Sequence, residues 1–334
     1  MSGRQKRFVI GVDAGNSKTH ALVADSDGRL LALGRTGPGN YEAVGMQQAM
    51  SNVLAACEQA RDQAGLKGEA EAVCFGLAGA DFPEDYVMLE SEVRKFGLAP
   101  KVQVVNDTMV GLRAGARQSY GVVVIMGSGA NAAGKSPAGH EVRVLGEGFE
   151  FGDWGGGYMI ASEVLHHVFR AYDGRGPQTM LTDLVLEATG KPDMEELTRA
   201  LYHEGLKGEA KLALAPLVFE AALEGDEVAC RLVRKIGEEA AACANAMIRR
   251  LALEREPVPV VLAGSIFKGK GPLLLDVVRE RVHEVAPKAC ISRPKFEPVV
   301  GAAILAMEMV GLVMDDDRWH AIEQTAAQLS LALQ

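Results

Sequence analysis

The stretch FVIGVDAGNSKT, residues 8–19, decides the interpretation of the fold. Its apolar, β-branched first part, Phe8 to Val12, ends at the acidic residue Asp13, and small residues rich in hydrogen-bond donors follow. Two further apolar runs flank the dipeptide Asp27-Gly28, a pair that favours a tight hairpin turn. The segment therefore predicts a strand, a turn, a second strand, a tight turn and a third strand.

A second segment has the same order of parts. Gly121 to Met126 is an apolar run, Gly127 to Gly129 is a loop of small residues, and Pro137 to Gly139 is a turn before another apolar run. Gly15 and Gly129 stand 114 residues apart, and the two turn glycines stand 111 apart. The nearly constant offset favours an internal duplication, although two hairpins alone could coincide by chance.

The rest of the chain alternates strand-like with helix-like patterns. Buried-strand runs occur at residues 72–77, 102–105 and 258–263, with helical periodicity between them. This alternation predicts mixed α/β sheets covered by helices. Residues 158–253 are almost wholly helical in pattern, which predicts a helical insertion, and residues 291–296 are expected to form a final strand.

Composition restricts the function. The 334 residues include 35 Lys and Arg against 44 Asp and Glu, a formal net charge of −9, and 48% are hydrophobic. These values are typical of a soluble globular protein long enough for two domains. The acidic balance argues against broad nucleic-acid binding, which requires a basic face. We therefore expect a small-molecule ligand.

Neither the cysteines nor the apolar runs indicate an unusual compartment. The five cysteines include no CxxC pair, which favours reduced thiols over a metal or redox motif. The first apolar run is too short for a signal peptide, and the most membrane-like stretch, Pro298 to Met314, carries Glu308 in its interior. We expect a cytoplasmic protein without a membrane partner.

The first hairpin loop has the chemistry of a phosphate site. Small side chains allow backbone N–H groups to approach phosphate oxygens, Lys18 and neighbouring hydroxyls add donors, and Asp13 can hold a hydrated Mg²⁺. The spacing is not that of a P-loop, and an ordinary hairpin turn is the alternative. Gly127-Ser128-Gly129 occupies the equivalent place in the second segment, and two such loops facing each other would clamp a polyphosphate.

Two further junctions join a strand to small or acidic residues. Asp107 follows the 102–105 strand, where it could cap a helix or, beside a phosphate site, accept a hydroxyl proton. Gly264 follows the 258–263 strand, where glycine permits a flat ligand to lie against the backbone; a helix-entry turn is the alternative.

This order of parts resembles the superfamily of acetate and sugar kinases, Hsp70 and actin, and more closely the N-acetylglucosamine kinase and BadF-type ATPase family. The resemblance covers nearly the whole chain. It implies an α/β protein of two RNase H-like lobes, the actin-like ATPase fold, with a ligand cleft between them and a helical insertion in the second lobe. We place the first lobe at 1–118, joined by a C-terminal helix at about 298–334, and the second at 119–297, with its insertion at 158–253.

The resemblance also implies roles for individual residues. Asp107 corresponds to the catalytic base and Asp13 to the metal-linked carboxylate, while sugar contacts are implied for Asn40, Asp107, Asn131 and Asp153. The implied nucleotide-binding residues come from the two phosphate loops and the adenosine loop: Gly15, Asn16, Ser17, Lys18, Thr19, Gly127, Ser128, Gly129, Gly264, Ser265 and Lys268.

The chain departs from the family pattern at two places. Trp154 stands where the family signature GDEGSGYW has Glu, and Glu147 stands where an upstream Gly-Trp-Gly has Trp. The exchange leaves the identity of the sugar open. One branch of the family carries an iron–sulfur cluster on cysteines near the second phosphate loop, and no cysteine lies between Cys74 and Cys230 here.

The resulting prediction is a kinase that uses ATP and Mg²⁺ to phosphorylate a hydroxyl of an amino sugar or N-acetylhexosamine, with N-acetylglucosamine or glucosamine first. One rival is a BadF-type ATPase that couples hydrolysis to a protein partner. The other is a sugar-sensing regulator, which the acidic balance disfavours. A homodimer is left open.

Overall fold

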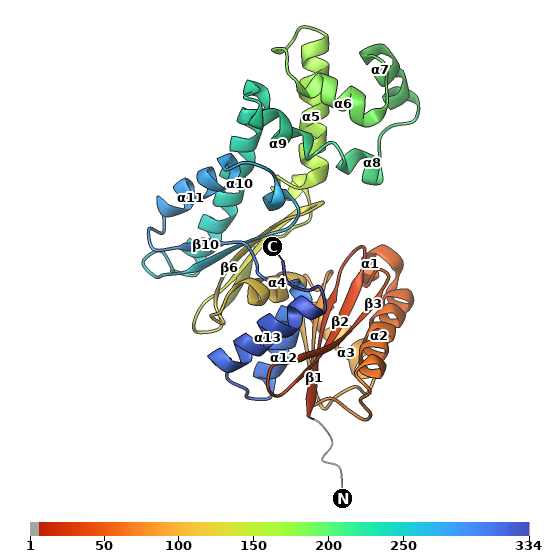
Figure 1. Ribbon diagram of the computed structural model, residues 1–334, viewed down its shortest axis with the longest axis vertical. Helices are drawn as coiled ribbons and strands as arrows, with labels where there is room; N and C mark the ends of the chain where they lie inside the picture. Colours follow the sequence, from red (N-terminus) through yellow and green to blue (C-terminus); the bar gives the residue numbers. More distant parts are fainter. Residues whose placement is uncertain (1–6, 334) are drawn as a thin grey trace, which may run out of the picture. The chain divides into compact units, whose positions relative to one another are not determined.

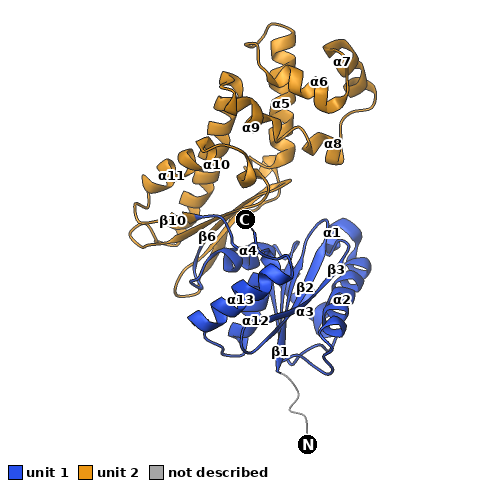
Figure 2. Ribbon diagram, in the orientation of Figure 1, with its two compact units in different colours: residues 1–121, 292–334 blue, residues 122–291 orange. Residues whose placement is uncertain are grey.

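The computed structural model describes residues 7–333 (Figure 1). The chain divides into two compact units (Figure 2): unit 1 comprises residues up to 121 together with 292–334, and unit 2 comprises residues 122–291. In the described residues, each unit is built on a mixed five-stranded sheet covered by helices. None of the described helices is long and apolar enough to cross a membrane.

The sheet of unit 1 has the order β3-β2-β1-β4-β5. β1 pairs antiparallel with β2 and parallel with β4, and β4 pairs parallel with β5, so the carboxyl ends of β1, β4 and β5 meet at one edge. At that edge Asp13 lies opposite Gly76, and Leu77 lies opposite Asn106. The strands are β1 (Phe8–Ala14), β2 (Thr19–Asp25), β3 (Leu30–Thr36), β4 (Ala72–Leu77) and β5 (Lys101–Asn106).

Helices of unit 1 lie very close to its sheet and to one another. A Cβ atom added at Gly11 of β1 would lie 2.1 Å from the backbone nitrogen of Ala303, and one at Gly301 would lie 2.0 Å from the carbonyl oxygen of Val110. Only glycine permits these approaches of α12 to β1 and α4. The helices are α1 (Tyr41–Val44), α2 (Met46–Gln63), α3 (Pro83–Arg94), α4 (Asp107–Gly115), α12 (Pro298–Met309) and α13 (Asp316–Gln328).

The C-terminal region differs from the prediction in two respects. The single helix expected at about 298–334 is two helices, because the chain turns at Gly311, whose φ of +82° is left-handed. The final strand, expected at 291–296, is β10 (Cys290–Ser292). Phe296 pairs instead with Ala332, which ties this segment to unit 1 and explains why the unit boundary falls at 291 rather than at 297.

The sheet of unit 2 repeats the strand order of unit 1. Its order is β8-β7-β6-β9-β10, with β7 antiparallel to β8 and β6 parallel to β9. Each sheet thus begins with two consecutive hairpins, as the two similar sequence segments predict, and has a parallel strand, β4 or β9, on the other side of its first strand. The strands besides β10 are β6 (Gly121–Met126), β7 (Ala130–Lys135), β8 (Glu141–Arg143) and β9 (Pro259–Ala263).

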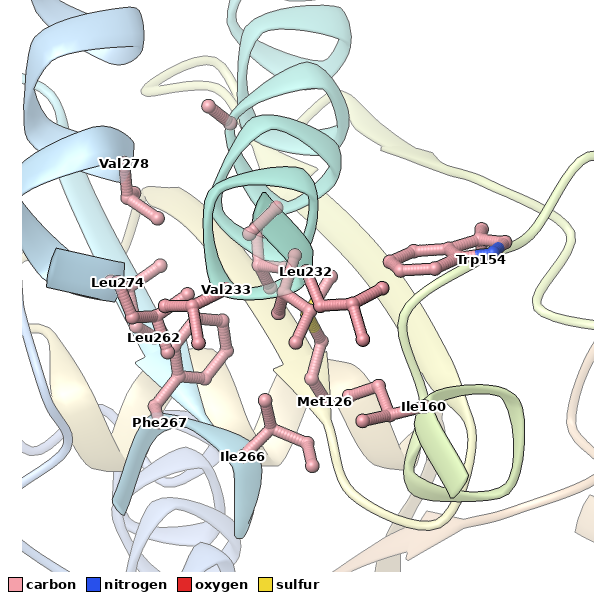
Figure 3. Packing of buried hydrophobic residues seen from close by; sticks show 14 of the residues in the cluster. Met126, Trp154, Ile160, Leu232, Val233, Leu262, Ile266, Phe267, Leu274 and Val278 are labelled. Carbon is pink, nitrogen blue, oxygen red and sulfur yellow. The ribbon is translucent and has the colours of Figure 1, made fainter. Parts of the chain in front are cut away.

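Helices fill the segment between β8 and β9, which confirms the predicted helical insertion. The helix at residues 227–250 packs on strands of the unit 2 sheet, and the other helices pack on one another. Met126, Leu232 and Leu262 belong to one buried cluster of this unit (Figure 3). The elements are η1 (Phe149–Phe151), α5 (Gly157–Tyr172), α6 (Leu181–Thr189), α7 (Met194–His203), α8 (Gly208–Leu212), α9 (Leu217–Leu223) and α10 (Glu227–Arg250), followed after β9 by η2 (Ile266–Lys268) and α11 (Leu273–His283).

Candidate functional site

Two carboxylates predicted for the site, Asp13 and Asp107, lie at the same edge of the unit 1 sheet. Burial raises the pKa of Asp13 to about 7; the nearby carboxylates of Asp107 and Glu297 add to the rise, and the Lys18 ammonium opposes it. When a cation binds beside a carboxyl group with a raised pKa, its positive charge favours the ionised carboxylate. Sequence reasoning missed Glu297, which immediately precedes α12.

The hydrogen-bond donors of the first loop, residues 15–19, differ in their exposure to solvent. The loop is closed by a hydrogen bond from the Gly15 N–H to the Lys18 carbonyl at 3.0 Å, and Asn16, Ser17 and Lys18 are exposed. Lys18 Nζ lies 3.7 Å from a Glu297 carboxylate oxygen. Thr19 is fully buried, and its hydroxyl has no hydrogen-bond partner among the described residues. The accessible donors of this loop are therefore those before Thr19.

Asn40 is joined to the first loop. Its backbone N–H and that of Gly39 both donate to the Gly15 carbonyl, at 3.3 and 3.0 Å, and its side-chain amide donates to Asn16 Oδ1 at 2.7 Å. Asn40 Oδ1 accepts from the Glu42 N–H and caps α1. The residue is 6% exposed. The predicted sugar-binding asparagine thus has a fixed orientation beside the predicted phosphate loop.

Asp107 is not the helix cap that sequence analysis offered as its alternative role. Asn106 caps α4, because its side-chain oxygen accepts from the backbone N–H and the hydroxyl of Thr108. Asp107 is the first residue of the helix, where the helix dipole favours a negative charge. Its side chain is therefore not required as the cap.

Sequence reasoning also missed Asp81. The Asn106 amide donates to the carbonyl oxygen of Ala80 and to Asp81 Oδ1, each at 3.1 Å. Asp81 lies in the short loop that follows β4, at the same sheet edge as Asp13 and Asp107. The rule that ligands bind at the carboxyl ends of parallel strands could have identified it.

The second loop packs against the start of α5. The N–H of Gly157 donates to the Gly127 carbonyl at 2.8 Å, and that of Tyr158 donates to the Ser128 carbonyl at 3.1 Å. A Cβ at Gly156 would lie 2.5 Å from backbone atoms of Gly129, so this contact requires glycine. By contrast, a Cβ at Gly127 or Gly129 would meet no described atom within 4 Å, and that side of the loop is open.

The third junction is fixed to the second loop. Gly264 has a φ of +101°, and a Cβ there would lie 2.2 Å from the Met126 carbonyl oxygen. Gly264 therefore brings the ends of β9 and β6 together. Ser265 and Lys268, on either side of the buried Ile266 and Phe267, are exposed.

A pocket of about 370 Å³ in unit 2 unites these two junctions. Gly127, Ser128, Ser265 and Lys268 line it, as predicted for a nucleotide site, but Gly264 does not. Sequence reasoning missed its apolar wall, because residues of the helical insertion show the same pattern as core residues. That wall consists of Leu212, Ala215, Pro216 and Phe219.

Asn131 and Asp153 are associated with one glycine-rich loop of unit 2. Asn131 on β7 lies against Gly146, where a Cβ would come within 2.5 Å of its side-chain nitrogen. Asp153 Oδ2 accepts from the Gly148 N–H at 2.9 Å, and the Asp153 N–H donates back to the Gly148 carbonyl. One carboxylate oxygen of Asp153 therefore closes the 148–153 turn.

Trp154 belongs to the core of unit 2. It is 9% exposed and lies in the same buried cluster as Ile160 and Leu232 (Figure 3). Lys235 Nζ lies 4.1 Å from its ring centroid and 2.8 Å from a Glu163 carboxylate oxygen. The departure from the family signature at this position therefore does not present an aromatic ring to solvent.

The carboxylates at this sheet edge suit a magnesium ion that is bound together with nucleotide phosphates, rather than a metal site built from protein side chains alone. No group of three or more His, Cys, Asp or Glu side chains among the described residues could hold a metal ion. Mg²⁺ is commonly bound through one or two carboxylates together with water and substrate phosphates. Asp13, partly buried at the end of β1, suits that arrangement.

The comparisons with known proteins agree with this fold. The model of the BadF/BadG/BcrA/BcrD ATPase family matches residues 10–306. The chain belongs to this family. An N-acetyl-D-glucosamine kinase of Dictyostelium discoideum is 31% identical over 90% of this chain and 98% of its own length. An N-acetylmuramic acid/N-acetylglucosamine kinase of Clostridium acetobutylicum is 29% identical over the same shares.

A solved structure has a similar fold. A Chromobacterium violaceum protein proposed to be an N-acetylglucosamine kinase matches with a TM-score of 0.66 and 25% identity, over 90% of this chain and 99% of its own. The two mixed five-stranded sheets with their helices thus confirm the predicted actin-like ATPase fold. Membership of an ATPase family implies that the nucleotide is ATP.

Proposed function

We propose that this protein is a kinase that transfers a phosphoryl group from ATP to a hydroxyl of an amino sugar or N-acetylhexosamine, N-acetylglucosamine or glucosamine first. The observation that carries the proposal is the meeting of Asp13 and Asp107 at one sheet edge, with Asp107 released from the capping role by Asn106. Two relatives that align with nearly the whole chain are sugar kinases, which supports a phosphotransferase activity.

In this proposal Asp107 is the general base. It orients the acceptor hydroxyl and takes its proton as the bond to phosphorus forms. Asp13 holds Mg²⁺ through its carboxylate, and the ion would neutralise phosphate charge when bound. Asn16, Ser17 and Lys18 supply exposed donors toward the same phosphates.

The pocket of unit 2 would hold the nucleoside. Its volume of about 370 Å³ lies within the range of small-molecule sites. Pro216 and Phe219 offer an apolar face to a flat base, and Gly269 fits closely beside it, since a Cβ there would lie 2.7 Å from the Phe219 ring. The open side of Gly127 and Gly129 leaves room for phosphate oxygens at the backbone.

Three polar residues would contact the sugar. Asn40 is buried and oriented by its hydrogen bonds. Asn131, on β7, and Asp153 lie against the same glycine-rich segment of unit 2. Short polar side chains beside glycine can reach ring hydroxyls without steric hindrance. A site built on such bonds discriminates strongly against sugars that lack the matching group.

The test is a coupled assay of ADP release over a panel of hexoses, hexosamines and N-acetylhexosamines, with and without Mg²⁺. We expect release to require both Mg²⁺ and an amino sugar or its N-acetyl derivative. ATP turnover that is indifferent to every sugar but increases with a protein partner would overturn the proposal in favour of a BadF-type ATPase coupled to that partner.

A further inference from the structure

The loop between β4 and α3 lies against Asn40 and is hydrogen-bonded to Ala14 and Asn106, the chain neighbours of Asp13 and Asp107. At its start, the Ala78 N–H donates to the Ala14 carbonyl at 2.9 Å, directly after Asp13. At Gly79, whose φ is +82°, a Cβ would lie 2.8 Å from Asn40 Oδ1. Asp81, at the far end of the loop, accepts from the Asn106 amide.

The Asn106 side chain has one orientation that satisfies its surroundings. Its amide nitrogen faces two acceptors, the Ala80 carbonyl and the Asp81 carboxylate, and its oxygen faces the Thr108 N–H and hydroxyl. Rotating the amide by half a turn would oppose acceptor to acceptor and donor to donor. Asn106 is 3% exposed, so water cannot easily replace a lost partner.

The loop that carries Asp81 is itself held in place. Asp85 Oδ2 accepts from the Phe82 N–H at 2.7 Å and from the Asp81 N–H at 3.3 Å. Its other oxygen accepts from the Tyr41 hydroxyl at 2.9 Å. The Asp81 carboxylate therefore meets Asn106 from a fixed backbone, and a hydrogen bond to an ionised acceptor is stronger than one between neutral groups.

We propose that Asp81 is a positioning residue for Asp107: by accepting from the Asn106 amide, it fixes the cap of α4 and with it the first helical residue, Asp107. This inference rests on the proposed function, since it concerns the same base. Asp81 acts through Asn106 and need not touch the sugar. Misplacing a catalytic group by about 1 Å can reduce a rate by about 100-fold.

The kinetic test compares Asp81→Ala with Asp81→Asn. Asparagine keeps an acceptor oxygen for Asn106 and removes the charge, whereas alanine removes the acceptor. We expect Asp81→Ala to lower kcat by about 10- to 100-fold with KM for sugar and ATP changed less than about 3-fold, and Asp81→Asn to restore most of kcat. Glu84→Gln, an exposed charge in the first turn of α3, is the matched control and should match wild type.

A second measurement does not depend on activity. In nuclear magnetic resonance spectra, the Asn106 side-chain amide protons should exchange slowly with solvent in wild type and Asp81→Asn, and faster in Asp81→Ala. Equal protection in all three proteins, an unchanged kcat in Asp81→Ala, or Asp81→Asn as impaired as Asp81→Ala would each overturn the inference. Absence of sugar-dependent ADP release in wild type would instead refute the proposed function, and the exchange measurement would still test the Asp81–Asn106 contact.

Discussion

The side-chain amide of Asn40 donates a hydrogen bond to Oδ1 of Asn16 at 2.7 Å. Asn16 belongs to the loop proposed for phosphate, whereas Asn40 is proposed to contact the sugar. Backbone hydrogen bonds from Gly39 and Asn40 to the Gly15 carbonyl run parallel to this contact. These hydrogen bonds join the two proposed subsites of unit 1. A substitution in one subsite should therefore alter ligand binding at the other.

Asn16→Ala should raise KM for the sugar by about 3- to 10-fold, although Asn16 lies in the phosphate loop, because Asn40 loses the acceptor that orients it. Asn16→Asp keeps an acceptor oxygen and should leave the sugar KM near that of wild type. Steady-state kinetics with varied sugar at saturating ATP provide the measurement. An unchanged sugar KM in Asn16→Ala would show that the contact does not orient Asn40.

Asp107→Asn should reduce kcat by at least about 100-fold with little change in nucleotide affinity, since the proposed base is lost and its size is kept. Because Asn106 and not Asp107 caps α4, the melting temperature should stay near that of wild type. Asn106→Ala is the complementary variant: loss of a cap typically costs about 1 kcal/mol, so its melting temperature should fall. Near-normal turnover in Asp107→Asn would exclude the base.

Sequence reasoning succeeded where a local pattern fixes a local structure. The two hairpins at residues 8–36, the strand at 72–77 and the helical insertion are encoded by apolar periodicity and turn residues, and they match the observed elements. It failed for contacts between distant segments. Nothing in the local sequence shows that Asp81 meets Asn106, or that Glu297 lies near Lys18, because strand order decides these contacts.

The same limitation explains why the apolar wall of the unit 2 pocket was not predicted from the sequence. Its glycines and serines were found because small residues after strands are a local signal, whereas Leu212 and Phe219 resemble core residues in the sequence. Trp154 shows the converse: it stands within a functional signature, but its side chain belongs to the buried core of unit 2. A motif identifies a segment, and only packing shows which of its side chains faces a ligand.

Asp13→Asn should separate stability from function. The pKa of Asp13 is about 7 in the folded protein against a usual value of 3.8. Between these two pH values the folded state therefore keeps a proton that the unfolded state has released. The contribution of protonated Asp13 to the free energy of unfolding is complete below pH 3.8 and is lost as the pH rises through 7. Asparagine does not ionise. In urea unfolding, the difference in free energy of unfolding between Asp13→Asn and wild type should therefore grow in favour of the variant from about pH 5 to about pH 8.

The same variant should lose function as it gains stability. Without the Asp13 carboxylate, Mg²⁺-dependent ATP binding should weaken and turnover should fall sharply, as is common where a destabilised group serves the active site. Titration calorimetry with ATP, with and without Mg²⁺, measures this loss. A variant whose stability advantage is independent of pH would contradict the raised pKa, and one with unchanged Mg²⁺ dependence would remove Asp13 from the metal site.

Gly127→Ala and Gly129→Ala test whether a phosphate approaches the second loop. A Cβ at either position meets no described atom within 4 Å, and neither residue has a left-handed φ, so both variants should fold with melting temperatures near that of wild type. An added methyl group would nevertheless occupy the space that phosphate oxygens need at the backbone N–H groups, and ATP affinity should fall by about 10-fold or more.

Gly156→Ala is the contrasting control for these two variants, because its Cβ would lie 2.5 Å from Gly129 backbone atoms in the protein without any ligand. It should lower the melting temperature as well as ATP affinity. Thermal unfolding and ATP titration on the same samples distinguish the two effects. If Gly127→Ala and Gly129→Ala bind ATP as tightly as wild type while remaining folded, the open side of the loop is ordinary solvent-exposed backbone, and the phosphates must be bound elsewhere.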